Sequence, residues 1–306
     1  MLKLLLVMSA CCFPAILSAQ KQQGVRYKDL VFTDVKVDKD LNYASAGDEK
    51  KDHEFDLYQP LNDPAKHRPL IIWMHGGGFK FGSKSVKEAQ FWCRMFAQRG
   101  YVCASINYRM SKNKFSFKFD DMQKSSYYAV QDEREAISYF KKNHELFNID
   151  PEKIILAGNS AGGIMALLAA YTGDAELARH TGVNMTEKVA LQHAKEPEKV
   201  AAVVNFWGAI YKLDWLKNAH VPIVSVCGSK DGIIPPKTKD GTMYGSIDIE
   251  KEAEQLHIPN KLKVFNGYSH ELQVHFNPFF ADKGTKGRWE KAGDFVADFL
   301  YEQLFK

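Results

Sequence analysis

The residue that first suggests chemistry is Ser160, in the run "IILAGNSAGGIMALLAAY" at positions 154–171. Glycines stand two residues before and two residues after this serine, where a short apolar run meets an Ala- and Leu-rich run. This is the G-x-S-x-G pattern of a nucleophile elbow, in which a sharp strand-to-helix turn raises the serine hydroxyl above the sheet. The alternative is a glycine-rich turn with an incidental serine at the start of the helix. We favour the nucleophile because strand, turn and helix follow in the required order.

A second glycine cluster occurs in "IIWMHGGGFKFGS", again after an apolar run. Three consecutive glycines cost chain entropy on folding, so a loop that only had to turn would seldom use them. We interpret them as a means of pointing backbone N–H groups at a ligand, with a merely flexible loop as the alternative. Gly77, Gly78 and Ala161 are then the expected donors of an oxyanion hole. His75 precedes the glycines, and we expect it to shape the loop rather than to act as a base.

A serine nucleophile needs a base and an acid, and two later segments supply candidates. Asp231 in "VSVCGSKDGIIP" and His270 in "KVFNGYSHEL" each follow an apolar run. Ligands of open α/β sheets gather at the carboxyl ends of the strands, where all three residues are expected. The order serine, aspartate, histidine is also the one that follows a nucleophile elbow. The competing residues lie further from a strand end or in a helical pattern: Asp240, Asp248, His257 and His275.

The elements that must position these residues alternate along the chain. Short apolar runs predict strands at 30–37, 53–60, 69–75, 101–108, 153–158, 200–208, 221–228 and 261–267. Longer amphipathic runs predict helices at 86–99, 121–143, 161–171, 247–256 and 289–304. Because the strands in the middle of the chain are almost continuously apolar, the pattern predicts an α/β fold with a mostly parallel central sheet and helices on both faces.

The N-terminus begins "MLKLLLVMSACCFPAILSAQ". Lys3, the apolar run after it and the small residues that end at Ala19 predict a secretory signal peptide over residues 1–19. The mature protein is then secreted or periplasmic. A membrane anchor is the alternative, but the run is shorter than the roughly 20 residues that span a bilayer. Lipidation at Cys11 or Cys12 is less favoured, since little apolar sequence precedes them.

The rest of the chain has the composition of a globular protein, with 45% hydrophobic and 25% charged residues. Residues 20–306 contain no Pro/Gly/Ser-rich linker and are expected to form a single domain. The net charge is only +4 and no block of like charges occurs, so no nucleic-acid partner is expected. No later run is apolar enough to cross a membrane. No His or Cys cluster has zinc spacing, and neither metal nor cofactor is expected.

The predicted mature chain keeps three cysteines, Cys93, Cys103 and Cys227. An odd number leaves at least one thiol free or paired outside the chain. Because Cys103 and Cys227 fall in apolar runs, we interpret them as small buried hydrophobic residues. A Cys93–Cys103 bridge would be possible in an oxidising compartment, but spacing alone does not establish it.

Taken together, these motifs resemble the serine esterase/lipase branch of the α/β-hydrolase family, and within it the "HGGG" group of hormone-sensitive-lipase-like and secreted bacterial carboxylesterases. The matching segments run from about Leu70 to His270 and include "HGGGFKFGS", "SINYR", "GNSAGG", "GSKDGIIP" and "GYSH". The resemblance implies a nucleophile, an acid, a base and an oxyanion hole, which are Ser160, Asp231, His270 and the backbone of Gly77, Gly78 and Ala161. Asn159 replaces the acidic residue most common at its position. It is not a triad residue, so activity is expected to remain.

Residues 28–58 indicate strands rather than the helical cap of hormone-sensitive-lipase-like enzymes, so little or no cap is expected. The chain is in this respect similar to feruloyl and acetylxylan esterases, which implies short-chain or glycan-linked acetyl or feruloyl esters as substrates. Residues 173–198 interrupt the alternation with a polar segment that is expected to contain a helix. This segment is either a lid or a surface excursion, and the latter is favoured.

Aromatic residues near the predicted strand ends are candidates for a substrate pocket. Phe206 and Trp207 follow "VVN" directly and could line such a pocket or pack in the core. A further aromatic group is "FSFKF", which contains Phe115, Phe117 and Phe119. Core or rim packing is the favoured interpretation for all four phenylalanines, Phe206 included.

Two other classes of protein share this fold. A serine peptidase usually carries an aromatic residue, not Ala161, after the serine, and a large additional domain for which this chain has no room. A non-catalytic binding module usually lacks the serine or the histidine, whereas both Ser160 and His270 are present. An ester hydrolase is therefore the favoured prediction.

Overall fold

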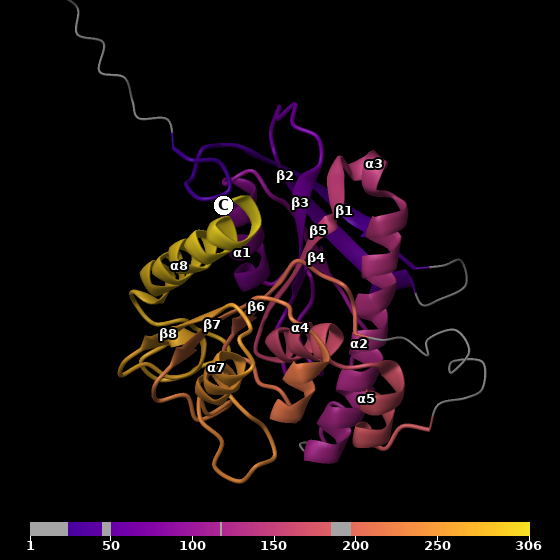
Figure 1. Cartoon of the computed structure of the whole chain (residues 1–306), viewed down its shortest axis with the longest axis vertical. Helices are drawn as coiled ribbons and strands as arrows, with labels where there is room; N and C mark the ends of the chain where they lie inside the picture. Colours follow the sequence, from indigo (N-terminus) through magenta and orange to yellow (C-terminus); the bar gives the residue numbers. More distant parts are fainter. Residues whose placement is uncertain (1–23, 45–49, 117, 185–196) are drawn as a thin grey trace, which may run out of the picture.

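A central eight-stranded sheet organises the computed structural model, which describes residues 24–44, 50–116, 118–184 and 197–306 (Figure 1). The spatial order of its strands is β1-β2-β4-β3-β5-β6-β7-β8. The strand bounds are β1 Val35–Asn42, β2 Glu54–Pro60, β3 Arg68–Met74, β4 Val102–Ile106, β5 Ile149–Asn159, β6 Ala202–Phe206, β7 Ile223–Gly228 and β8 Asn260–Phe265. The predicted leader at 1–19 lies outside the described residues.

Strands β3 to β8 run parallel to one another, and the antiparallel pairs are β1 with β2 and β2 with β4. All seven residues of β3 are buried, because β4 and β5 flank it and helices cover both faces. In register, Met74 of β3 lies beside Gly158 of β5, which places the ends of the "HGGG" and "GNSAGG" segments side by side. The predicted α/β fold with a mostly parallel sheet is confirmed.

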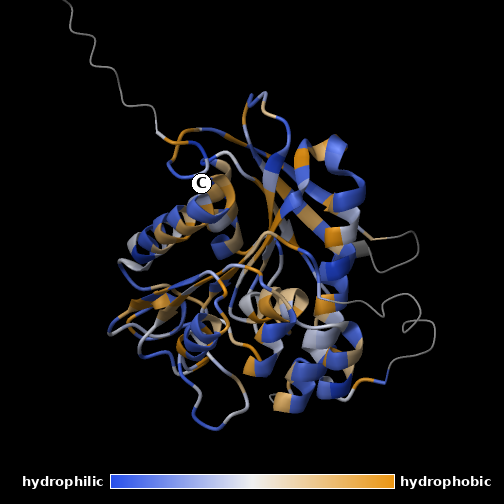
Figure 2. Cartoon of the chain, in the orientation of Figure 1, coloured by the Kyte–Doolittle hydropathy of each residue, from blue (hydrophilic) through white to orange (hydrophobic). Residues whose placement is uncertain are grey.

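Two layers of helices enclose the sheet (Figure 1). Helices α1 and α8 cover one face, while α2, α4 and α7 cover the other and α5 packs against α2. Figure 2 shows polar residues on the outer surfaces of these helices and apolar residues on the strands between them. The helix bounds are α1 Lys87–Ala97, α2 Phe119–Lys142, α3 His144–Phe147, α4 Ala161–Tyr171, α5 Asp174–Thr181, α7 Ser246–Gln255 and α8 Thr285–Phe305.

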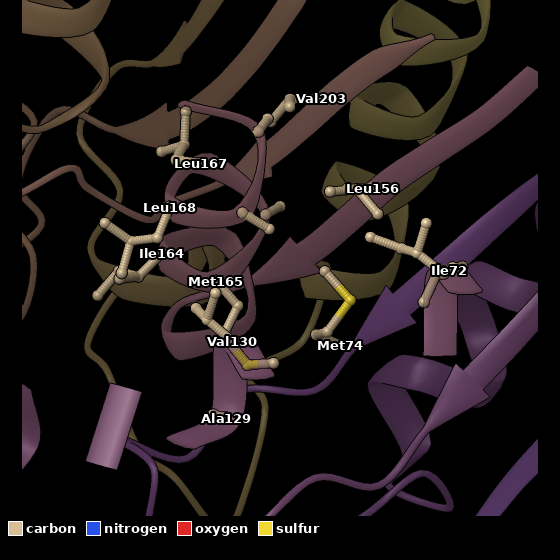
Figure 3. Close-up of a cluster of buried hydrophobic side chains, with 14 of the residues drawn as sticks. Ile72, Met74, Ala129, Val130, Leu156, Ile164, Met165, Leu167, Leu168 and Val203 are labelled. Carbon is tan, nitrogen blue, oxygen red and sulfur yellow. The ribbon is translucent and has the colours of Figure 1, made fainter. Parts of the chain in front are cut away.

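Helix α4 is buried along its whole length, which explains why its sequence is almost free of polar residues. Its side chains Ile164, Met165 and Leu168 belong to the same hydrophobic cluster as Ile72 and Leu156 of the sheet (Figure 3). A fully buried helix is apolar on every side rather than amphipathic. The packing fixes α4 against the sheet and so fixes the turn that leads into it.

The first strand is displaced from its predicted position, whereas the polar segment at 173–198 contains the expected helix. The first strand covers 35–42 rather than 30–37. The described residues within 28–58 contain β1, β2 and a short 3-10 helix, Lys50–His53, but no helical cap. The polar segment at 173–198 contains the expected helix, α5, which is tied to α2 by a 2.8 Å hydrogen bond from Gln131 Nε2 to Asp174 Oδ1. Residues 185–196 lie outside the described part, so a lid function stays a prediction.

The three cysteines of the described chain are buried and unbridged. Cys93 of α1 and Cys103 of β4 approach each other, with 2.7 Å between their Sγ atoms. Burial raises the pKa of the Cys93 thiol well above its usual range and that of Cys227 to about 12. Thiols that stay protonated are poor nucleophiles. Within the described ranges, no helix combines the length and apolar character needed to cross a membrane.

Candidate active site

Ser160 stands at the turn between β5 and α4 with a backbone conformation of φ 55° and ψ −116°. A positive φ is strained for a residue with a Cβ and persists only where the surroundings enforce it. The Ser160 amide donates to the Phe206 carbonyl oxygen (2.9 Å), and the Ser160 carbonyl accepts from the Ile164 amide (3.0 Å). These bonds to β6 and α4 hold the turn, so the side chain projects from the end of the strand.

The glycines around Ser160 are there because the backbone passes too close to its neighbours for a side chain. A Cβ at Gly162 would lie 2.0 Å from the Met74 carbonyl oxygen, and one at Gly158 would lie 2.4 Å from the Gly162 carbonyl carbon. Both distances are far below van der Waals contact. The G-x-S-x-G spacing therefore reflects a close crossing of β3, β5 and α4.

Three side chains from distant parts of the sequence meet at this turn. His270 Nε2 lies 3.0 Å from Ser160 Oγ, and His270 Nδ1 lies 2.7 Å from Asp231 Oδ2. All three residues are buried. Asp231 follows β7 and His270 follows β8, so the parallel sheet brings them to one edge. In this arrangement the imidazole can take the proton of the hydroxyl while the carboxylate fixes the ring tautomer.

The carboxylate of Asp231 is itself held in place. Its Oδ1 atom accepts hydrogen bonds from the backbone amides of Ile233 and Ile234, both at 2.9 Å. With Oδ1 occupied, Oδ2 is the atom that faces His270. The backbone thus supplies the orientation that a lone aspartate on a loop would lack.

The competing residues are engaged or exposed elsewhere. Asp240 accepts hydrogen bonds from the amide and hydroxyl of Thr242, and Asp248 Oδ2 accepts from the amide of Thr238. His257 and His275 are exposed to solvent. The geometry therefore selects Asp231 and His270 among the residues that the sequence offered.

The "HGGG" loop lies directly beside the serine. A Cβ at Gly76 would be 2.8 Å from Asn159 Nδ2 and 3.3 Å from Ser160 Cβ. Gly77 has φ +114° and Gly78 has φ +62°, which are conformations that favour glycine. Ala161 begins α4, and the first amides of a helix have no partner within the helix. Gly76, which directly precedes the predicted donors Gly77 and Gly78, thus lies beside Ser160, and the third predicted donor, Ala161, is the next residue after it.

His75 shapes this loop, as its position before the glycines predicted. Its Nδ1 atom lies 2.7 Å from the Gly76 carbonyl oxygen, and its ring stacks on Tyr108 with 4.4 Å between the ring centroids. The Tyr108 hydroxyl donates to the His75 carbonyl at 2.7 Å. Burial lowers the pKa of His75 to about 4, so the ring is neutral near pH 7.

The two aromatic residues that follow β6 have different surroundings. Phe206 is fully buried and stacks on Trp92 of α1, with 4.3 Å between the ring centroids. It packs in the core, as favoured for the phenylalanines, and the alternative of a pocket residue is wrong, because the last residue of a strand buried on both faces points into a helix layer. Trp207 instead meets His270 edge-on at 6.4 Å and has φ 42°. Its buried Nε1 has no hydrogen-bond partner among the described residues.

The "FSFKF" phenylalanines do not behave as one group. Phe115 is 91% exposed, and Phe117 lies outside the described residues. Phe119 begins α2 and meets Tyr211 edge-on, with 6.0 Å between the ring centroids.

Sequence reasoning missed two neighbours of His270. Phe276 packs edge-on against the imidazole, with 5.0 Å between the ring centroids. Glu271 is the next residue in the chain and has φ 56°, and burial raises the pKa of its carboxyl to about 7. Both residues belong to an irregular turn. No periodic pattern marks which side chains of such a turn point inward, so neither could be identified from the sequence.

The chain is similar in sequence to a known protein family and to several characterised proteins. The family model described as BD-FAE matches residues 55–231. Gut esterase 1 of Caenorhabditis elegans is 32% identical over 114 residues, which cover 36% of this chain and 20% of that protein. Arylacetamide deacetylase of Bos taurus is 27% identical over 233 residues, which cover 64% of this chain and 55% of that protein. The chain thus spans between about a fifth and about half of the length of these curated relatives.

Solved structures share the fold at low sequence identity. Esterase 2 of Thermogutta terrifontis phosphorylated by paraoxon matches with a TM-score of 0.61 and 20% identity, covering 89% of this chain and 95% of that one. A truncated carbohydrate esterase from gut microbiota matches with a TM-score of 0.60 and 18% identity, covering 89% of this chain and 97% of that one. These similarities show the α/β-hydrolase fold over most of the chain.

Proposed function

The chain belongs to the BD-FAE family, and from that premise we propose that it is a serine hydrolase of carboxylic esters. The observation that carries the proposal is the relay of hydrogen-bonding distances from Asp231 through His270 to Ser160. A strained turn and a glycine-rich loop hold this relay at one edge of the sheet. The esterase names of its relatives support the same activity.

In the acylation step, Ser160 Oγ attacks the carbonyl carbon of the ester while His270 Nε2 takes the hydroxyl proton. The negative charge that forms on the carbonyl oxygen is stabilised by the amides of Gly77, Gly78 and Ala161. Collapse of this intermediate breaks the bond to the alcohol, which leaves with the proton from His270. Asp231 keeps Nδ1 protonated and stabilises the transient imidazolium.

In the deacylation step, water takes the place of the alcohol. His270 Nε2 removes a proton from the water as its oxygen attacks the acyl carbon, and the same proton returns to Ser160 Oγ when the acid leaves. The enzyme is thereby restored. This sequence of bond changes needs neither a metal nor a redox cofactor.

We propose short-chain or carbohydrate-linked esters, acetyl or feruloyl, as the substrates. Among the described residues before β3, at 24–44 and 50–67, no cap helix occurs, and residues 35–42 and 54–60 are strands. A site without such a cap can receive an ester that is attached to a larger molecule. One protein of similar structure is a carbohydrate esterase, which supports carbohydrate-linked esters as substrates.

We further propose that the protein is exported. The proposal depends on residues 1–19, where a lysine, an apolar run and small residues follow in the order of a signal peptide. Expression of the full chain with fractionation should give a protein outside the cytoplasm that begins near Gln20. Recovery of a cytoplasmic protein that keeps its first residues would contradict export.

The decisive experiment is active-site labelling with a fluorophosphonate probe. Wild-type protein should be labelled and Ser160→Ala should not, because the serine oxygen forms the bond to phosphorus. Equal labelling of both proteins would exclude Ser160 as the nucleophile. A labelled protein that cleaves an aminoacyl anilide and not p-nitrophenyl acetate would be a peptidase.

A substrate panel then defines the acyl group. The panel consists of p-nitrophenyl acetate, butyrate and octanoate, methyl ferulate and acetylated xylan. We expect the highest kcat/KM with acetate or ferulate. Activity confined to octanoate would overturn the carbohydrate-ester proposal.

A further inference from the structure

A pocket of about 600 Å³ lies beside the triad loops and has no role in the chemistry described above. Its lining includes Phe119 and Gln123 at the start of α2, His180 near the end of α5, Tyr211 after β6, and Thr242 before α7. Ser160, Asp231 and His270 are not among its lining residues.

Aromatic rings form one wall of this pocket, and the protein holds them in place. Tyr211 is buried, and its hydroxyl donates to Ser126 Oγ at 3.0 Å. The ring of His180 stacks on Tyr211, with 5.4 Å between centroids, and Phe119 meets Tyr211 edge-on. The wall is therefore set before a ligand arrives, which lowers the entropic cost of binding.

Hydrogen-bonding groups alternate with these rings. Gln123 Nε2 lies 2.9 Å from His180 Nε2, and the Thr242 hydroxyl lies 2.7 Å from Asp240 Oδ1. Lys212 and Asp214 also line the pocket and carry opposite charges. Burial, followed by the charge of Lys212, lowers the pKa of His180, which therefore stays neutral near pH 7. The side chains thus favour a ligand with no net charge and many hydroxyl groups.

The pocket and the triad are built on the same loops. The loop after β6 begins with Trp207, which packs on His270, and continues to Tyr211. The loop after β7 carries Asp231 and continues to Thr242. An antiparallel bridge between Ile210 and Tyr244 ties the two loops together. A ligand in the pocket therefore lies at the same edge of the sheet as Ser160.

We propose that this pocket binds a neutral sugar ring of the substrate, on the carbohydrate side of the ester. The partly exposed rings of Phe119 and His180 can stack on the apolar face of a sugar, while the buried Tyr211 supports them. The amide of Gln123 and the hydroxyl of Thr242 bind its hydroxyl groups. This inference rests on the proposed ester hydrolase activity for its role in turnover, but the binding itself does not depend on catalysis.

The test separates binding from catalysis. Xylotriose, cellotriose and mannotriose are titrated into Ser160→Ala by calorimetry, so that no ester chemistry is involved. We expect at least one trisaccharide to bind, and Gln123→Ala or Thr242→Ala, introduced into the same background, to weaken that binding about tenfold, as the loss of one hydrogen bond does. Thr242→Ser keeps the hydroxyl and should bind normally. Lys239→Ala, an exposed residue of the same loop outside the pocket lining, is the matched control.

Turnover gives a second readout in the wild-type background. Gln123→Ala and Thr242→Ala should lower kcat/KM about tenfold for acetylated xylo-oligosaccharides and leave p-nitrophenyl acetate unchanged. The proposed sugar site is wrong if no trisaccharide binds. It is also wrong if the two variants lower kcat/KM equally for both substrates. If wild-type protein does not hydrolyse p-nitrophenyl acetate, the proposed esterase activity is wrong instead. The calorimetry then still shows whether the pocket binds a sugar.

Discussion

Asp231 Oδ2 lies 2.7 Å from His270 Nδ1, and both side chains are buried. The contact requires a proton on Nδ1, which leaves Nε2 free to accept the proton of Ser160. An asparagine at position 231 could turn its amide N–H toward Nδ1 and favour the opposite tautomer. We therefore expect Asp231→Asn to lower kcat by about 10,000-fold with little change in folding.

The measurement is kcat with p-nitrophenyl acetate, beside circular dichroism to establish that the variant is folded. Asp240→Asn is the control, because Asp240 is exposed and bonded to Thr242 rather than to His270. It should retain the wild-type rate on this small substrate. A folded Asp231→Asn that keeps more than a tenth of the activity would show that another group orients the histidine.

Gly77 and Gly78 are adjacent glycines with positive φ, but their surroundings differ. A Cβ at Gly77 would lie 2.1 Å from the Phe81 carbonyl oxygen, whereas a Cβ at Gly78 would meet nothing within 4 Å. Gly77→Ala must therefore move the loop and its amide away from the oxyanion position. We expect a loss in kcat of about 100- to 1000-fold, the effect of removing one oxyanion donor.

Gly78→Ala is the matched comparison, because an alanine at this position meets no clash. Its cost is that of the left-handed backbone conformation, which destabilises a residue with a Cβ by about 1–2 kcal/mol. It should lower the melting temperature slightly and keep most of the activity. Both variants are assayed for kcat and for thermal unfolding. Equal losses of activity in the two variants would mean that the clash with Phe81 does not control the loop.

The main features of this site could be predicted from the sequence because they depend on local patterns. The elbow at Ser160 is a strand, a turn and a helix in succession. The glycines at 158 and 162 indicate that the backbone passes close to neighbouring segments there. That Phe206 packs against Trp92 of α1 could not be predicted, since the sequence does not show which helix layer a strand-end residue faces. The same limit applies to the sugar pocket, where α2, α5 and two loops meet only in three dimensions.

The carboxyl of Glu271 should make stability depend on pH. Burial raises its pKa to about 7 from the ordinary value of 4.5. Between these two values the folded protein keeps a proton that the unfolded chain has released. The free energy of unfolding therefore decreases as pH rises from about 4.5 to 7, by up to about 3 kcal/mol from this group.

Glu271→Gln removes the ionisable group and retains an oxygen that can accept the 3.1 Å bond from Gln273 Nε2. This variant should be more stable than wild type at pH 8 and equally stable at pH 4. Urea unfolding at the two pH values measures the difference. Parallel loss of stability in both proteins across this range would assign the pH dependence to other groups.

Trp207 has a buried indole N–H with no hydrogen-bond partner among the described residues. Removing an unpartnered donor costs no hydrogen bond. The free energy of unfolding of Trp207→Phe should therefore lie within about 1.5 kcal/mol of the wild-type value, despite the smaller ring. Trp207→Ala instead leaves a cavity beside His270 and should lose about 3–5 kcal/mol. The comparison separates the packing of the ring from the chemistry of its nitrogen.

Chemical denaturation of both variants gives the stabilities, and kcat with p-nitrophenyl acetate reports the position of His270. Because the Trp207 ring meets the imidazole edge-on at 6.4 Å, the cavity in Trp207→Ala should let the imidazole move and lower kcat. Trp207→Phe retains an aromatic edge and should keep kcat within about tenfold. If Trp207→Phe is as unstable as Trp207→Ala, the packing beside His270 needs the whole indole ring, and an aromatic edge alone does not hold the imidazole.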